Sequence, residues 1–424
     1  MWNEIKAALS YSLAGDKGRK TKNALIIGII GALILLFLNR FVFFNLIDFD
    51  HFFIHSALAR LLFLNNISPY RTDIIPVLNN FFSTRSIDAT PEVFKFSDPV
   101  FQLFFYLPFS LMKDPRWSAA LFLTINQGLL IGSLEVIFRL LSWKPEWKTK
   151  LWMTGITIFS CPGLFFFINP DLTLIQFFLF LMGLDLSMRS RAVSGGVLLG
   201  LSLLSFSIVL LPLLVLISYL GFSKKQTPVI WFLISTVLFS LLGAIFDNNW
   251  LLKMIRNFFA APLYFPFTSY SSALNVVSSG AILPTLVNFV PMILFVMIAL
   301  EWVRMPKESH LHLYWLIAFL ITMNPVIAAV ENFQPSPFSI FVYSFIIYLW
   351  ISRSEGKIKK YLLGGFTLLY LVLPIIGKLF PDVFMFLNSS FGYNLIIFFL
   401  TLTMLYWVRW WVVQNPLESV ELEE

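Results

Sequence analysis

The chain has 424 residues and a formal net charge of +7; 58% of its residues are hydrophobic, only 12% are charged, and 48 are phenylalanines. A soluble domain carries about a quarter charged residues, because its surface must be hydrated. The composition therefore excludes a soluble protein and predicts an all-α polytopic membrane protein, because helices satisfy the backbone hydrogen bonds within lipid. The single cysteine, Cys161, excludes a disulfide framework and a metal site built on thiolates.

Apolar runs alternate along the chain with short basic loops. Thirteen runs are found, at 24–47, 99–112, 117–142, 151–168, 171–187, 192–206, 207–222, 227–246, 282–303, 311–330, 336–351, 361–380 and 391–413. The basic loops predict topology, because lysine and arginine concentrate on the cytoplasmic side of a membrane. The same rule argues against a nucleic-acid partner, because the positive charges belong to these loops.

The run 99–112 decides the number of crossings. It has only fourteen residues and contains Pro108, and at 1.5 Å per residue it spans about 21 Å of a hydrocarbon core about 30 Å thick. If it does not cross, the basic loops around Lys148 and Lys224 become cytoplasmic. We therefore predict about 12 transmembrane helices (11–13), with both termini cytoplasmic and the chain in the plasma membrane.

This topology defines the domain organisation. A cytoplasmic segment, 1–23, precedes a single integral membrane domain, 24–413, and an acidic cytoplasmic tail, 414–424. Two external loops result, 48–116 and 247–281. We expect the first to hold membrane-surface helices, including an amphipathic helix over Asp50–Leu64.

The first external loop carries the most informative polar cluster. Directly after the first run come Asp48 and Asp50, followed by His51, His55 and Arg60. A carboxylate can act as a general base on an acceptor hydroxyl, and nearby cations can stabilise charge on a departing phosphate. Alternatively, Asp48 and Asp50 only cap a surface helix. Between the two as base, we favour Asp50 and expect Asp48 to cap the helix.

Other polar residues have a functional and a structural interpretation. His51 and His55, four residues apart, could bind a metal with Asp48, but we expect no cofactor, because surface helices commonly carry histidine at their polar boundary. Lys253 and Arg256 precede an aromatic stretch and could hold a phosphate or anchor the chain at the interface. Glu331 and Asn332 could hydrogen-bond sugar hydroxyls.

The order of motifs resembles a known family. Asp48-Phe49-x-x-Phe52-Phe53 after the first span, then Pro69-Tyr70, Phe94-Lys95-Phe96, Pro108 and finally Trp117 with Asn126 are similar to glycosyltransferase family 87. These are membrane mannosyltransferases of the GT-C superfold. The resemblance covers mainly 45–130 and is looser, in topology, to about 350.

The resemblance implies transfer of a hexose, mannose in that family, from a polyprenyl-phosphate donor to a lipid or glycan acceptor on the extracytoplasmic face. Asp50 or Asp48 would be the catalytic base, and membrane lipids would surround the protein. The substrate-binding candidates are His51, His55, Arg60, Tyr70, Arg71, Lys95, Lys253, Arg256, Asn169, Asp171, Glu331 and Asn332.

The chain also departs from the family pattern. Asn169-Pro170-Asp171 stands where the family has Gly-Gln, and Ser205-Phe206-Ser207 follows Gly200 where the family has a lysine. If that lysine meets the donor phosphate, we expect Lys253 and Arg256 to replace it. Two alternatives remain open: a catalytically altered GT-C-like protein, and a transporter or flippase of a lipid-linked or anionic substrate.

Overall fold

The computed structural model describes most of the predicted apolar runs. The described residues are 16–42, 44, 49–71, 73–84, 96, 98–160, 163–164, 166, 171–189, 191–204, 206–260, 296–304, 310–327, 336–353, 361–367 and 390–414. All regular structure in these residues is helical, and no strand occurs among them. The all-α class predicted from composition is confirmed for this part of the chain.

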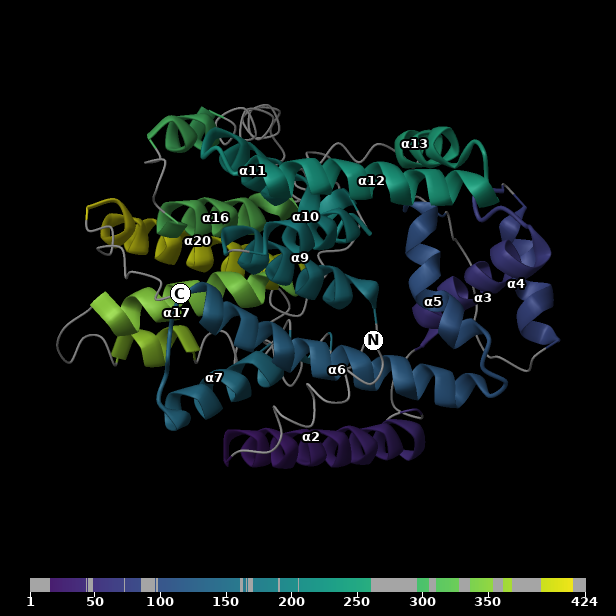
Figure 1. The fold of residues 1–424 in the computed structure, drawn as a ribbon, viewed down its shortest axis with the longest axis horizontal. Coiled ribbons are helices and arrows are strands. Elements are labelled where there is room, and N and C mark those ends of the chain that lie inside the picture. Colours follow the sequence, from purple (N-terminus) through teal and green to yellow (C-terminus); the bar gives the residue numbers. More distant parts are fainter. Residues whose placement is uncertain are drawn as a thin grey trace.

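Two long helices pack together near the N-terminus of the described chain. Helix α2 spans Asp16–Phe41 and lies along α6, Pro115–Leu140 (Figure 1). The start of α6 follows from its sequence: the Asp114 side chain accepts a hydrogen bond from the Arg116 backbone N–H, and Pro115 fits the first helical turn. Between the helices, the buried Asn39 donates from Nδ2 to Gln127 Oε1 at 2.9 Å.

Four short elements form one end of the molecule (Figure 1). They are α3 (Asp50–Asn65), α4 (Ile74–Ser83), the 3₁₀ turn η2 (Val100–Gln102) and α5 (Leu103–Ser110). Helix α5 has only eight residues and contains Pro108, so it is too short to cross a bilayer, as predicted for 99–112.

The helix predicted over Asp50–Leu64 exists as α3, but it is not amphipathic. Most of its side chains are buried: Phe52, Phe53, Ile54, His55, Ala57, Leu58, Ala59, Leu61 and Leu62. The prediction of an amphipathic helix is wrong because α4 and α5 pack against α3. Helix α4 is the amphipathic one; it buries Ile74, Leu78 and Phe82, at intervals of four residues.

Six described helices come next after α6 in the chain. They are α7 (Trp147–Phe159), α9 (Leu172–Met188), α10 (Ala192–Leu201), α11 (Phe206–Phe222), α12 (Gln226–Phe246) and α13 (Trp250–Ala260). Helix α10 lies against α9 and α12 through glycines. A Cβ on Gly196 would lie 2.9 Å from Trp231 Cβ and 3.0 Å from the backbone N of Phe232. Small residues are what allow helix backbones to approach this closely.

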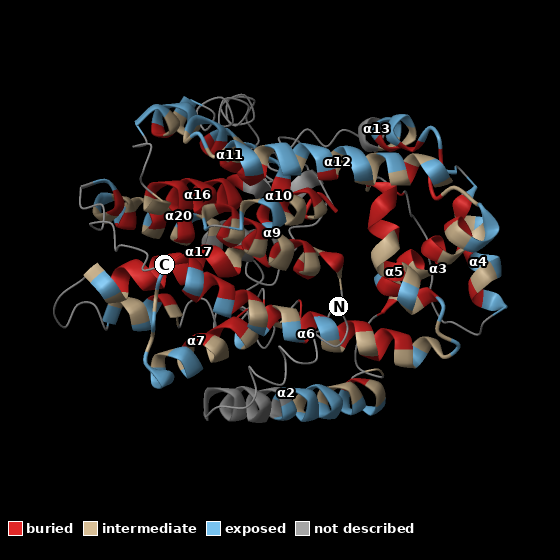
Figure 2. Ribbon diagram, in the orientation of Figure 1, coloured by how far each residue is buried: buried red, intermediate tan, exposed pale blue. Residues whose placement is uncertain are grey.

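The C-terminal helices contain much of the buried core (Figure 2). They are α16 (His310–Ile327), α17 (Phe338–Arg353) and α20 (Ser390–Gln414); further helical residues lie at 296–304 and 361–367. Trp315 Nε1 in α16 donates to the Leu405 carbonyl in α20 at 2.8 Å. Arg409 donates from Nε and Nη2 to the two carboxylate oxygens of Glu301, at 3.1 and 2.7 Å.

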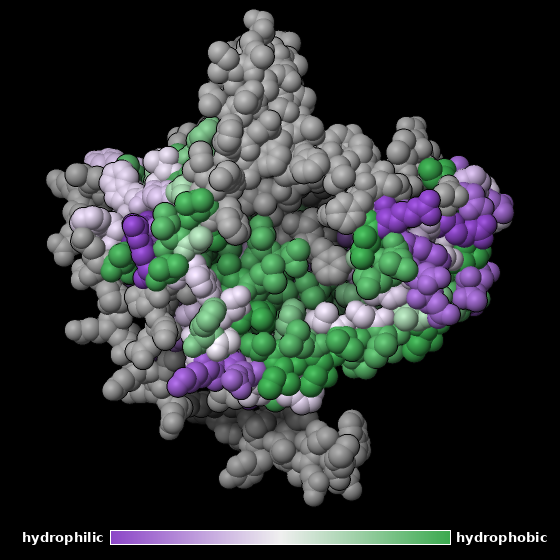
Figure 3. Space-filling model, turned by 90° about the horizontal axis from the view of Figure 1, so that it is seen from above, coloured by the Kyte–Doolittle hydropathy of each residue, from purple (hydrophilic) through white to green (hydrophobic). Residues whose placement is uncertain are grey.

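Two described helices, α6 and α12, are long and apolar enough to cross a membrane by length and composition. Apolar side chains are exposed along α12, among them Leu233, Val237 and Leu241; much of the α12 ribbon has the colour of exposed residues in Figure 2. Figure 3 shows hydrophobic side chains over the middle of one face and hydrophilic ones gathered at the end that holds α4. Exposed apolar surface of this extent is typical of contact with lipid or protein rather than with water.

Candidate functional site

The predicted base lies at the start of α3. Asp50 is the first residue of the helix, and the N-cap position is held by Phe49, with no side-chain capping hydrogen bond. We expected Asp48 to hold this position; it is one residue too early, and its own placement lies outside the described residues. The negative charge of Asp50 lies in the first turn, where it is favoured by the helix dipole.

His51 and His55 share the next face of α3. Their ring centroids lie 4.2 Å apart, and His55 Nδ1 lies 2.8 Å from the His51 carbonyl oxygen. Because a carbonyl only accepts, a neutral His55 must carry its proton on Nδ1 to form this hydrogen bond. His55 is buried, whereas the side chain of His51 is 59% exposed. His51 is therefore the histidine that an incoming molecule can reach.

Asp171 reaches the same place from another part of the chain. It occupies the N-cap position of α9, and its carboxylate accepts a hydrogen bond from Thr173 Oγ1. Its Oδ1 lies 4.0 Å from His51 Nδ1, with the Asp171 side chain 28% exposed. The start of α3 and the start of α9 thus present Asp50, His51 and Asp171 in one region of the structure.

A buried tyrosine packs against one histidine of this group. The ring of Tyr106 in α5 stacks on His55, with centroids 5.2 Å apart. Burial, followed by the charges of Asp171 and Asp98, raises the pKa of the Tyr106 hydroxyl well above its ordinary value. Tyr106 therefore keeps its proton and can serve only as a neutral group. Burial, with the charge of His51 second, lowers the pKa of His55 to about 3, so this histidine is neutral near pH 7.

Tyr70, part of the Pro69-Tyr70 motif, fastens the loop that follows α4. Its hydroxyl donates to the Asp98 carbonyl at 2.6 Å, and its ring lies 5.2 Å from that of Phe96. Asn257 Nδ2 in α13 donates to the Phe96 carbonyl at 3.0 Å. Burial raises the Tyr70 pKa. These contacts favour a role for Tyr70 in holding residues 96 and 98 rather than in contacting substrate.

Lys253 forms an ion pair with a carboxylate. Its Nζ lies 2.8 and 2.9 Å from the two oxygens of Asp247, which also accepts from Ser68 Oγ. The Asp247 side chain is buried and that of Lys253 is 42% exposed. The expectation that Lys253 is free to hold a phosphate is therefore weakened, whereas Arg256, on the same helix α13, is exposed.

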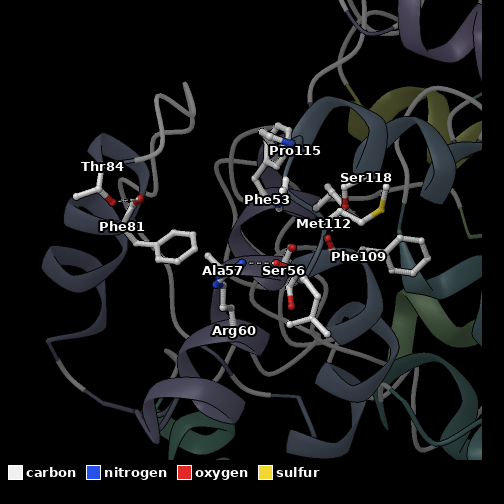
Figure 4. Close-up of a pocket in the computed structure, with 14 residues that line it drawn as sticks. Phe53, Ser56, Ala57, Arg60, Phe81, Thr84, Phe109, Met112, Pro115 and Ser118 are labelled. Carbon is white, nitrogen blue, oxygen red and sulfur yellow. Dashed lines mark hydrogen bonds between the residues drawn. The ribbon is translucent and has the colours of Figure 1, made fainter.

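The remaining basic candidates of this loop do not join the histidines. Arg71 pairs with Asp73 at the surface, at 2.6 Å. Arg60 Nη1 donates to the Ser110 carbonyl at 2.9 Å and lines a separate pocket of about 640 Å³ (Figure 4). Four further candidates, Lys95, Asn169, Glu331 and Asn332, lie outside the described residues.

Sequence reasoning missed three members of this neighbourhood: Tyr106, Asp98 and Asp247. Tyr106 lies within an apolar run, where an aromatic residue gives no functional signal. The described residues contain no group of three His, Cys, Asp or Glu side chains that could hold a metal ion. Comparison with protein-family models, with curated proteins and with solved structures finds no match to this chain.

Proposed function

We propose that the protein is a membrane-embedded glycosyltransferase. It moves a hexose, by the family resemblance mannose, from a polyprenyl-phosphate donor to a lipid or glycan acceptor on the extracytoplasmic face. The observation that carries this proposal is the contact of His51, which follows Asp50 in the first turn of α3, with Asp171 at the start of α9. Two carboxylates and an accessible imidazole suit deprotonation of a hydroxyl and hydrogen bonding to a sugar.

The reaction assigned to this group is a single displacement. Asp50 takes the proton of the acceptor hydroxyl as the acceptor oxygen forms its bond to the anomeric carbon. The bond from that carbon to the phosphate oxygen breaks, and the polyprenyl phosphate leaves with the electron pair. Attack from the opposite face inverts the sugar carbon. Asp171 and His51 hold hydroxyl groups in place, and Arg256 is the cation for the phosphate.

The proposal includes the full topology, with 12 crossings, both termini cytoplasmic and a plasma-membrane location. It is supported by a helix within every apolar run that the structure describes, by the eight residues of α5, and by the distribution of basic loops. Single cysteines in a Cys161→Ser background test it. Ser83→Cys should react with an impermeant reagent in intact cells, and Lys148→Cys only after permeabilisation. Reaction of both in intact cells would contradict this topology.

The carboxylates of the remaining helices give the transporter alternative less support. Asp185 in α9 is buried and pairs with Arg139 and Arg189, each at 2.9 Å. Glu301 is held by Arg409. Both pairs lie near helix ends predicted to be cytoplasmic, whereas a translocation pathway requires ionisable groups near mid-membrane.

Membrane extracts test the function directly. Extracts with the wild-type protein, given radiolabelled polyprenyl-phosphate mannose, should form labelled product that extracts lacking the protein do not. The Asp50→Asn and Asp171→Asn variants should form much less. Label that moves across sealed vesicles without forming product would instead favour transport.

A further inference from the structure

A pocket lies on the side of α3 that faces away from the histidines. It has a volume of about 640 Å³ (Figure 4). Phe53, Ser56 and Arg60 line it, and the 3.6-residue repeat places them about 150° around the helix from His51 and His55. Phe81 of α4 and Thr84, which follows that helix, close it on one side, and the end of α5 with the turn into α6 (109–115) closes it on the other side (Figure 4).

The lining combines an apolar wall with positive charge. Phenylalanine rings come from three elements, and Arg60 and Lys113 are the charged groups among the described residues of the lining. Arg60 donates one N–H to the Ser110 carbonyl, and this hydrogen bond fixes its guanidinium in place. Among the described residues, no carboxylate forms an ion pair with Arg60 or Lys113. Two cations beside an apolar wall match an anionic head group joined to a hydrocarbon chain.

The neighbouring residues place this pocket at the level of lipid head groups. Lys113 lies two residues before the start of α6, a helix long enough to span a membrane. One turn further on, Trp117 packs edge-on against Phe37 and Phe41 of α2, and the Arg40 guanidinium lies 5.6 Å from the Trp117 ring. Aromatic and arginine side chains of this kind mark the membrane–water interface.

The pocket is distinct from the proposed reaction site. Arg60 follows Asp50 by ten residues, which corresponds to about 15 Å along α3, and it faces the opposite side of the helix from His51. A phosphate held by Arg60 is therefore too far from Asp50, His51 and Asp171 to be the leaving group. A molecule bound here is a second ligand.

We propose that this pocket binds one anionic glycerophospholipid of the outer leaflet. Arg60 and Lys113 hold its phosphate, Ser56 and Thr84 offer hydroxyl groups to the head group, and an acyl chain lies against Phe53, Phe81 and Phe109. Because α3 carries Asp50 at its start, the bound lipid fixes the helix that presents the proposed base. Glycosyl transfer is not required for the lipid to bind.

Native mass spectrometry of the full-length protein in detergent tests this site. Dioleoyl-phosphatidylglycerol is the probe, dioleoyl-phosphatidylcholine the zwitterionic comparison, and glycerol phosphate the head group without a chain. We expect one phosphatidylglycerol per chain, retained in preference to both comparisons. The Arg60→Gln/Lys113→Gln variant should bind it about tenfold more weakly. Lys144→Gln/Lys148→Gln, which removes two charges from another loop, should bind it as the wild type does.

A second variant covers the case in which the charge change disturbs folding. Ser56→Trp fills the pocket without changing charge and should lose the lipid as well. Equal retention of phosphatidylglycerol by the wild type and both pocket variants would overturn the proposal, as would equal binding of phosphatidylcholine. Binding of polyprenyl phosphate, with no binding of phosphatidylglycerol at the same concentration, would overturn the choice of a glycerophospholipid. None of these outcomes depends on sugar transfer, so failure here is distinguishable from failure of the proposed function.

Discussion

Asp171 Oδ1, at the start of α9, lies 4.0 Å from His51 Nδ1 in the first turn of α3. These residues are far apart in the sequence, and their contact joins the first external loop to the helix that follows the third predicted crossing. The contact places a second carboxylate in the region of Asp50. It is the feature of the structure that bears most directly on the proposed chemistry.

The first prediction concerns this contact. Asp171→Asn and His51→Gln should each slow sugar transfer by about tenfold or more, because each removes a group that positions the reacting molecules. Thermal stability should change little, because an ion pair with partners this exposed contributes about 1 kcal/mol or less. Initial rates and melting temperatures of the purified variants check both statements. The control is Glu146→Gln, which replaces an exposed carboxylate at the start of α7. Loss of activity in this variant too would contradict a specific role for Asp171 and His51.

The second prediction concerns pH. His55 is buried and has a pKa of about 3 in the folded protein, against about 6.5 in the unfolded chain. Between these values the unfolded chain binds the extra proton, so His55 destabilises the folded state progressively as the pH falls from about 6.5 towards 3. His55→Gln retains a donor for the His51 carbonyl and does not titrate.

Thermal unfolding across this pH range measures the difference. The His55→Gln variant should lose less melting temperature on acidification than the wild type, although its stability near neutral pH is lower because the stacking on Tyr106 is lost. Parallel pH curves for the two proteins would show that His55 does not contribute to acid sensitivity.

The third prediction separates Lys253 from Arg256. Lys253→Gln leaves the buried Asp247 without its cation, so it should lower thermal stability, by about 1–3 kcal/mol. Arg256→Gln removes an exposed charge and should keep stability but slow transfer about tenfold, if Arg256 contacts the donor phosphate. The opposite result would be an unchanged rate for Arg256→Gln and a stable but slow Lys253→Gln variant. It would show that Lys253, and not Arg256, contacts the donor phosphate.

The fourth prediction tests the close packing of α10. An alanine normally stabilises a helix relative to glycine by about 1 kcal/mol. At Gly196 the added Cβ would meet backbone and Cβ atoms that cannot move independently, so Gly196→Ala should destabilise the protein by about 1–3 kcal/mol. Gly221→Ala in α11, where nothing lies within 4 Å, is the matched control and should be neutral or stabilising. Equal melting temperatures would mean that α10 does not pack as described.

The positions of the helices could be predicted because a run of apolar residues is visible in the local sequence. The run 99–112 was recognised as too short for a crossing from its length and Pro108, and α5 agrees. The burial of α3 could not be predicted in this way. Its mixture of polar and apolar residues is the same whether it lies on lipid or, as found, beneath α4 and α5.

The site was predictable only in part for a related reason. Asp50, His51 and His55 were found because they are close in sequence. The approach of Asp171 and the stacking of Tyr106 depend on how distant helices pack, which a single sequence does not reveal. The pairing of Lys253 with Asp247 likewise could not be read from the spacing alone, and it changes the expected role of this lysine.

The most direct test of the central claim is the initial rate of transfer from radiolabelled polyprenyl-phosphate mannose, in membranes holding equal amounts of wild-type protein or Asp50→Asn. Asparagine keeps the shape of the side chain and removes the base. We predict product with the wild type and a rate lower by about 10² or more with Asp50→Asn. Wild-type rates in Asp50→Asn, Asp48→Asn and the double variant would contradict the claim that this loop carries the base.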